Sequence, residues 1–195
     1  MSLKTLLNRN YLFILSIFVF SVFINRYYAN LGVFPLDTFY HFDLGFRILQ
    51  GEIPFTDIWM VSGVLINYVQ ALFFFILGIN WNTYVLHASL MNGLISIATY
   101  FTLKEFKLNI NYCFIYSILF SVLAYTSSGT PFVDHHSAFF SLLGVYSSLL
   151  AIKKEKKNIL DYITNIFWFW FFVKTGTDFL YYILYYCGGF AICFC

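Results

Sequence analysis

Long apolar runs alternate with short polar segments along this chain, and the pattern predicts a bundle of α-helices. A helix needs roughly 20 predominantly apolar residues to cross a bilayer, so the shorter runs would extend into their flanks. The runs are 11–25, 59–79, 83–103, 110–126 and 137–152, with two further stretches at 159–173 and 178–195. We therefore expect an all-α, polytopic membrane helix bundle that forms a single membrane domain over residues 1–195.

The main polar interruption is residues 34–57, FPLDTFYHFDLGFRILQGEIPFTD, within a first loop of about residues 30–58. Pro35 resists continuation of the first helix, and Asp37 can cap a new helix over about 38–50. Phenylalanine and leucine recur there at three- and four-residue steps, which gives one apolar stripe. Such a helix is too short to span a bilayer, and we expect it to lie in the membrane interface.

Composition supports a membrane protein. Hydrophobic residues make up 61% of the chain and charged residues only 10%, whereas soluble domains average about 25% charged residues. The formal net charge of +2 is too small to indicate binding to nucleic acid. The four cysteines lie in apolar runs, and their spacing fits neither a disulfide framework nor a zinc site.

Basic residues set the predicted topology. Those that precede the first apolar run, which has no small-residue cleavage site after it, indicate a retained signal anchor with a cytoplasmic N-terminus. If residues 59–79 cross the membrane, the basic cluster at 153–157 falls outside, against the positive-inside rule. If 59–79 instead lies along or dips into the outer leaflet, that cluster is cytoplasmic. We favour this second arrangement, which places an acidic loop at about 127–137 on the same outer face as Asp37.

Asp37 and His41 are the first candidates for chemistry. They are four residues apart, so on a helix they would lie on one face. A carboxylate there could accept a proton from an acceptor hydroxyl, or hold a metal or a sugar. The alternative is a helix cap with an interfacial histidine, and spacing alone does not decide between them.

Other charged residues lie close by in the first loop. Asp43 and Arg47 are also four apart, and we expect a surface ion pair. Glu52 and Asp57 flank an Ile-Pro-Phe turn near the candidate site, where each could contact substrate or simply be solvated.

A second polar group, Asp134, His135 and His136, opens the apolar run at 137–152. These side chains could cap the helix, bind a divalent ion, or contact the phosphate of a lipid carrier. Adjacent histidines point in different directions on a helix, so a metal site made by both is a weak expectation. His87 lies within an apolar run, where it could be functional or could bond another helix.

The order of these features resembles a known family. The chain reads D..YH and then RILQGEIPFTD in the first loop, SGVLINY before the next apolar run, and VDHHSAFFSLL later. This resembles the N-terminal half of the polytopic GT-C glycosyltransferases, in the group similar to protein mannosyltransferases, aminoarabinose transferases and RgtA-to-D-like proteins. The match covers about residues 10–152, and its most specific part is the first loop.

The resemblance implies an inverting transfer of a sugar from a polyprenyl-phosphate donor to a lipid, glycan or protein acceptor. It would take place on the outer face of a bacterial inner (plasma) membrane. Asp37 resembles the catalytic carboxylate of the first loop, and Asp134 resembles a second acidic residue that orients substrate or a divalent cation. Lys174 resembles a lysine after a later span. Candidate substrate-binding residues are His41, Glu52, Asp57, His135, His136 and Lys174.

Family members are longer and have more spans, so the resemblance also implies a fragment, which could be incomplete or inactive on its own. The alternative is a non-catalytic polytopic membrane protein, such as a transporter remnant or a bundle subunit. A transporter would need polar residues along a midplane pathway and broken helices, and His87 and Asn92 are among the few polar residues that could serve.

Overall fold

The computed structural model describes residues 3–33, 35–60, 62–125 and 129–154, which form six α-helices and no strand. The all-α prediction is confirmed for this part of the chain. The predicted apolar stretches at 159–173 and 178–195, with Lys174, lie outside the described residues. The helices are α1 (Leu3–Ala29), α2 (Pro35–Leu49), α3 (Leu65–Leu77), α4 (Trp81–Glu105), α5 (Ile110–Ala124) and α6 (Val133–Lys154).

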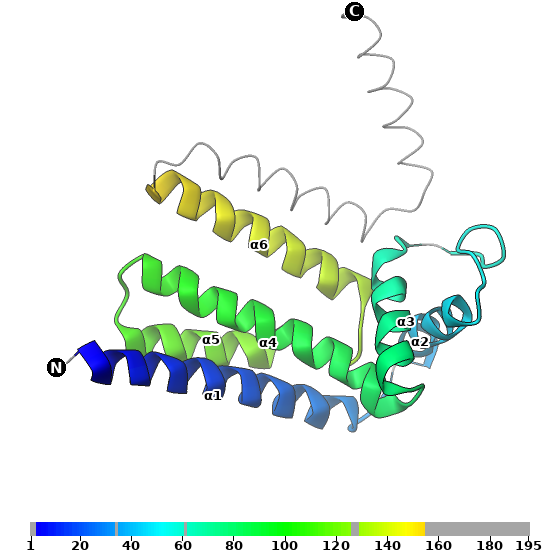
Figure 1. The fold of residues 1–195 in the computed structure, drawn as a ribbon, viewed down its shortest axis with the longest axis horizontal. Helices are drawn as coiled ribbons and strands as arrows, with labels where there is room; N and C mark the ends of the chain where they lie inside the picture. The colour runs from blue at the N-terminus through cyan, green and yellow to red at the C-terminus, as the bar shows by residue number, and fades with distance from the viewer. Residues whose placement is uncertain (1–2, 34, 61, 126–128, 155–195) are drawn as a thin grey trace, which may run out of the picture.

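Four helices run side by side in alternating directions, with α4 between α1, α5 and α6 (Figure 1). The two short helices α2 and α3 pack on each other across one end of this bundle. That end also holds the last turn of α1, the first turn of α4 and the first turn of α6. Segments far apart in the sequence therefore meet there.

Charges are divided between the two ends of the bundle. One end carries five basic residues together with Glu105, and we call it the basic end: Arg9, Lys104, Lys107, Lys153 and Lys154. The α2–α3 end carries five carboxylates together with Arg26 and Arg47, and we call it the acidic end: Asp37, Asp43, Glu52, Asp57 and Asp134. Contacts hold the basic end together, since Lys154 Nζ lies 3.4 Å from Glu105 Oε2 and Arg9 donates a hydrogen bond to Asn111.

Polar side chains are buried between the helices, while large apolar side chains cover the outside. Asn92 is fully buried and donates to the Ser121 carbonyl at 2.9 Å. By contrast, Phe75, Leu123 and Ile152 are 74%, 73% and 74% exposed. A protein dissolved in water keeps most polar side chains on its surface and avoids wide apolar patches, so this distribution is the opposite of the one expected in water. Two helical segments, Arg9–Ala29 and Val133–Lys154, are long and apolar enough to cross a membrane.

Two predicted boundaries change in the structure. The helix inside the predicted run 59–79 is only the 13-residue α3, about 20 Å long, so it cannot by itself cross a hydrocarbon core of about 30 Å. The predicted cap at Asp37 is wrong, because α2 begins two residues earlier, at Pro35. Proline is favoured in a first helical turn, and Asp37 in that turn still complements the helix dipole.

Candidate functional site

One buried tyrosine joins the two acidic segments at the acidic end. The Tyr84 hydroxyl donates to the Thr38 carbonyl at 2.6 Å and lies 3.4 Å from the Pro131 carbonyl. Thr38 follows Asp37 directly, and Pro131 lies three residues before Asp134. The structure thus brings the beginnings of α2 and α6 together, and Asp37 and Asp134 are both exposed there.

His41 lies behind these two carboxylates. Its side chain is buried, its Nδ1 is 2.9 Å from Asn67 Oδ1, and its ring meets the Phe132 ring edge-on at 6.1 Å. Burial lowers the pKa of His41, against the opposing effects of the Asn67 hydrogen bond and the charges of Asp37 and Asp134. Because burial lowers its pKa below the ordinary value of 6.5, the His41 imidazole is neutral at pH 7.

The lowered pKa of His41 predicts how stability depends on pH. Below pH 6.5, the ordinary value, an unfolded chain takes up a proton on His41 that the folded chain does not. Stability should therefore fall as pH drops from 6.5 to the lowered pKa, by at most about 1.4 kcal/mol per pH unit from this residue. His41→Gln should flatten this dependence in denaturation curves of the detergent-solubilised protein. Parallel wild-type and variant profiles would refute the assignment.

Two further histidines meet inside the bundle. His87 Nδ1 lies 2.9 Å from Gln70 Oε1, and its Nε2 lies 3.2 Å from His136 Nε2. His136 Nδ1 lies 2.8 Å from the Tyr125 hydroxyl. Sequence analysis identifies His136 as a candidate and leaves the role of His87 undecided. It predicts neither the contact between these two histidines nor the contact of His136 with Tyr125. Asn67 and Gln70 were visible only as polar residues in an apolar run.

His135 points elsewhere, as expected for adjacent helical histidines. Its ring is half-buried and stacks on Tyr125, with centroids 4.8 Å apart at 24°. Its Nδ1 has no hydrogen-bond partner among the residues that the structure describes. This nitrogen is also buried, so it is not open to a ligand in this arrangement, and both nitrogens of His136 have neighbours within the bundle.

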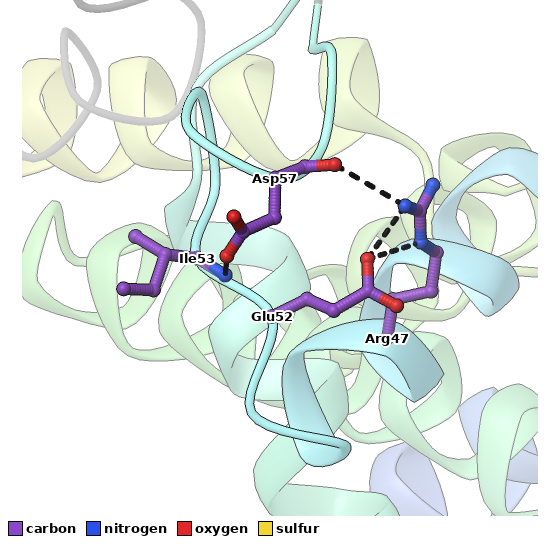
Figure 2. A network of polar contacts seen from close by, with 4 residues as sticks. All are labelled: Arg47, Glu52, Ile53 and Asp57. Atoms are coloured by element: carbon purple, nitrogen blue, oxygen red, sulfur yellow. Dashed lines mark hydrogen bonds and ion pairs between the residues drawn. The ribbon is translucent and has the colours of Figure 1, made fainter.

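The turn after α2 is closed by polar contacts (Figure 2). Arg47 Nε donates to Glu52 Oε2 at 2.7 Å, and its Nη2 donates to the Asp57 carbonyl at 3.3 Å. Asp57 Oδ2 accepts from the Ile53 amide at 2.8 Å. The predicted Asp43–Arg47 ion pair is wrong, because Arg47 pairs with Glu52. Glu52 and Asp57 shape this turn, and their contact with substrate stays a prediction.

The resemblance raised the possibility of a divalent cation at the carboxylates. In the described residues, no group of three or more histidine, cysteine, aspartate or glutamate side chains could hold a metal ion. Asp37 and Asp134 therefore do not build such a centre with the other residues described, and no step below runs through a divalent cation.

Comparison with known proteins finds no relative of this chain. No family model matches the chain, and neither a curated protein nor a solved structure does. Support for a function comes from the site itself and from the loop motifs, whose likeness to GT-C enzymes stays an expectation.

Proposed function

We propose that this chain is the membrane-embedded module of a GT-C-like glycosyltransferase. It moves a sugar from a polyprenyl-phosphate donor to a lipid, glycan or protein acceptor at the outer face of a bacterial inner membrane. One observation carries the proposal: Asp37 and Asp134, from distant parts of the sequence, lie at the same end of a bundle whose sides are apolar, where Tyr84 contacts both of their segments.

The bundle in this proposal is polytopic. Helices α1, α4 and α6 cross the membrane, and α2 with α3 lies in the outer interface. Helix α5 has only 15 residues, about 22 Å, so it crosses together with the residues that flank it. Helix α4 is less apolar than a typical span, but its polar side chains are buried against neighbouring helices rather than turned to lipid. The basic end then faces the cytoplasm, in keeping with the positive-inside rule, and the acidic end faces outward.

The proposed reaction is a single displacement. The Asp37 carboxylate takes the proton of the acceptor hydroxyl as the acceptor oxygen attacks the anomeric carbon. The bond from that carbon to the phosphate oxygen breaks, and polyprenyl phosphate leaves with the electron pair. The anomeric configuration inverts. Asp134, in the first turn of α6, orients the sugar. Both carboxylates are exposed, so a lipid-linked donor can reach them.

The donor phosphate is expected next to the first turn of α6. A neutral imidazole N–H can donate to a phosphate oxygen, and of the two adjacent histidines His135 is part-exposed whereas His136 is buried. His41 is buried, and its Nδ1 is hydrogen-bonded to Asn67 of α3. This contact supports the first turn of α2. Lys174, which lies outside the described residues, remains a predicted phosphate contact.

The test is turnover of a defined donor. The purified chain, reconstituted in vesicles, would be given short-chain polyprenyl-phosphate sugars with labelled hexose or aminopentose. We expect released polyprenyl phosphate and an inverted glycosidic product. Absence of donor consumption with every donor and acceptor class would favour a non-catalytic membrane protein.

A further inference from the structure

The turn after α2, residues 52–59, presents an apolar surface to its surroundings. Ile53, Phe55 and Trp59 are 58%, 36% and 80% exposed, and we call these three side chains the apolar edge. Pro54 and Ile58, which lie between them in the sequence, are buried. A loop that faces water seldom gathers large apolar side chains on its exposed side, so the apolar edge calls for an apolar neighbour.

Contacts within the chain hold this turn in one shape. Phe55 has φ +66°, a left-handed conformation that a bulky side chain rarely adopts. Its amide donates to the Ile58 carbonyl at 2.9 Å, and Ile58 packs in a buried cluster with Leu44 of α2. Strained backbone persists only where its surroundings impose it, and it gathers in segments that bind something. The apolar edge is therefore formed before any partner covers it.

The backbone of the turn has no amide to offer an outside partner. From Glu52 to Asp57, every backbone N–H donates to an oxygen of the turn itself or of the last turn of α2, and Pro54 has none to give. The Arg47 guanidinium bonds to Glu52 and to the Asp57 carbonyl. A bound peptide or sugar would need such donors, whereas hydrocarbon accepts a loop only when they are satisfied. The turn thus suits a partner that forms no hydrogen bonds.

Helix α3, which follows the turn, indicates what that partner is. Its inner face buries the polar side chains of Asn67 and Gln70 completely. Its outer face is apolar and carries the exposed side chains of Tyr68, Leu72, Phe75 and Ile76. These four recur at three- and four-residue steps and share one side of the helix. Polar groups inside and apolar groups outside are the arrangement of a helix that faces lipid, so lipid lies next to the turn.

We propose that the turn is a membrane anchor, whose apolar edge lies among the headgroups and upper acyl chains of the outer leaflet. Tryptophan is enriched at this level of a bilayer, because its ring is apolar while its N–H can reach water. The turn projects beside the four-helix bundle at the α2–α3 end (Figure 1). The inference rests on the outward placement of that end in the proposed function, but it does not require sugar transfer.

The test is the fluorescence of Trp59 in a chain whose other tryptophans, Trp81, Trp168 and Trp170, are replaced by phenylalanine. The chain would be reconstituted in vesicles of phosphatidylethanolamine and phosphatidylglycerol, with iodide on both sides. The protein leaves Trp59 80% exposed, so only lipid can shield it. We expect loss of iodide quenching, emission at shorter wavelength than in water, and stronger quenching by lipids brominated high in the acyl chain than low. Full iodide quenching without quenching by brominated lipid would overturn the proposal.

Two variants in this background test the apolar edge itself. Ile53→Asp places a charge where lipid disfavours it, so it should restore iodide quenching and reduce quenching by brominated lipid. Gln50→Asp adds the same charge at an exposed residue outside the apolar edge and should change neither. Equal effects of the two variants would also overturn the proposal. The measurement on Trp59 alone remains decisive if unfolding curves in detergent show that Ile53→Asp does not fold.

Donor turnover in the same vesicles separates this inference from the proposed function. A shielded Trp59 without turnover would refute the transfer reaction and leave the anchor in place. Turnover with Trp59 open to iodide would refute the anchor alone.

Discussion

Asp37→Asn is expected to lower the rate of sugar transfer by about 10²–10⁴-fold, the usual contribution of a positioned general base. Asparagine has nearly the same shape but cannot take the acceptor proton. Asp37 is exposed in the first turn of α2, so the substitution should leave the fold intact. The measurement is the initial rate of donor consumption in vesicles at saturating donor, with unfolding curves recorded alongside.

Asp43 provides a matched control on the same helix. It is also an exposed aspartate, and the hydrogen bonds of Arg47 go to Glu52 and Asp57 instead. Asp43→Asn should therefore keep the wild-type transfer rate. A full rate in Asp37→Asn, or an equal loss in both variants, would show that Asp37 has no role as base.

Gly129→Ala is expected to destabilise the fold by about 3 kcal/mol, from overpacking together with left-handed backbone strain. Gly129 has φ +64°, and an added Cβ would lie 2.5 Å from the Ala29 amide nitrogen and 2.6 Å from the Asn25 carbonyl oxygen. Both are backbone atoms of α1, so no side chain can move aside. The Gly129 carbonyl also accepts from Asn25 Nδ2 at 2.8 Å, and the shift would stretch this bond.

Gly32→Ala is the control for this substitution. A Cβ at Gly32 would meet nothing within 4 Å, so its effect on unfolding by denaturant or heat should be small. Because Gly129 fixes the segment before α6 against α1, Gly129→Ala should also displace Asp134 and slow transfer. Equal stability of the two alanine variants would contradict the close packing at Gly129.

Sequence patterns predicted the elements because these depend on local signals. The apolar runs gave helices, and Pro35 with Gly51 bounded the predicted interfacial helix to within a few residues of α2. The distribution of basic residues along the chain favoured a segment at 59–79 that lies along or dips into the outer leaflet. The structure has a helix of 13 residues there, and its place in the membrane stays a prediction. The same reasoning placed Asp134 and Asp37 at one end, where the structure has them.

The pairing of polar side chains could not be predicted, because it depends on how helices pack. Each of His41, Asn67, His87 and His136 was visible as a polar residue, but nothing in the sequence says which faces which. Arg47 illustrates the problem: the helical spacing favoured Asp43, yet the chain reverses at Gly51, where φ is +92°. The reversal returns Glu52 to the last turn of α2, and Arg47 bonds to it there.

The central claim, that the acidic end faces outward and the basic end faces the cytoplasm, is tested most directly by cysteine labelling. Asp43→Cys and Lys154→Cys would be made separately in a chain without its native cysteines, and intact cells treated with a membrane-impermeant maleimide. We predict that Asp43→Cys is labelled in intact cells and Lys154→Cys only after permeabilisation. Labelling of Lys154→Cys from outside, or protection of Asp43→Cys, would contradict the topology on which the proposed site depends.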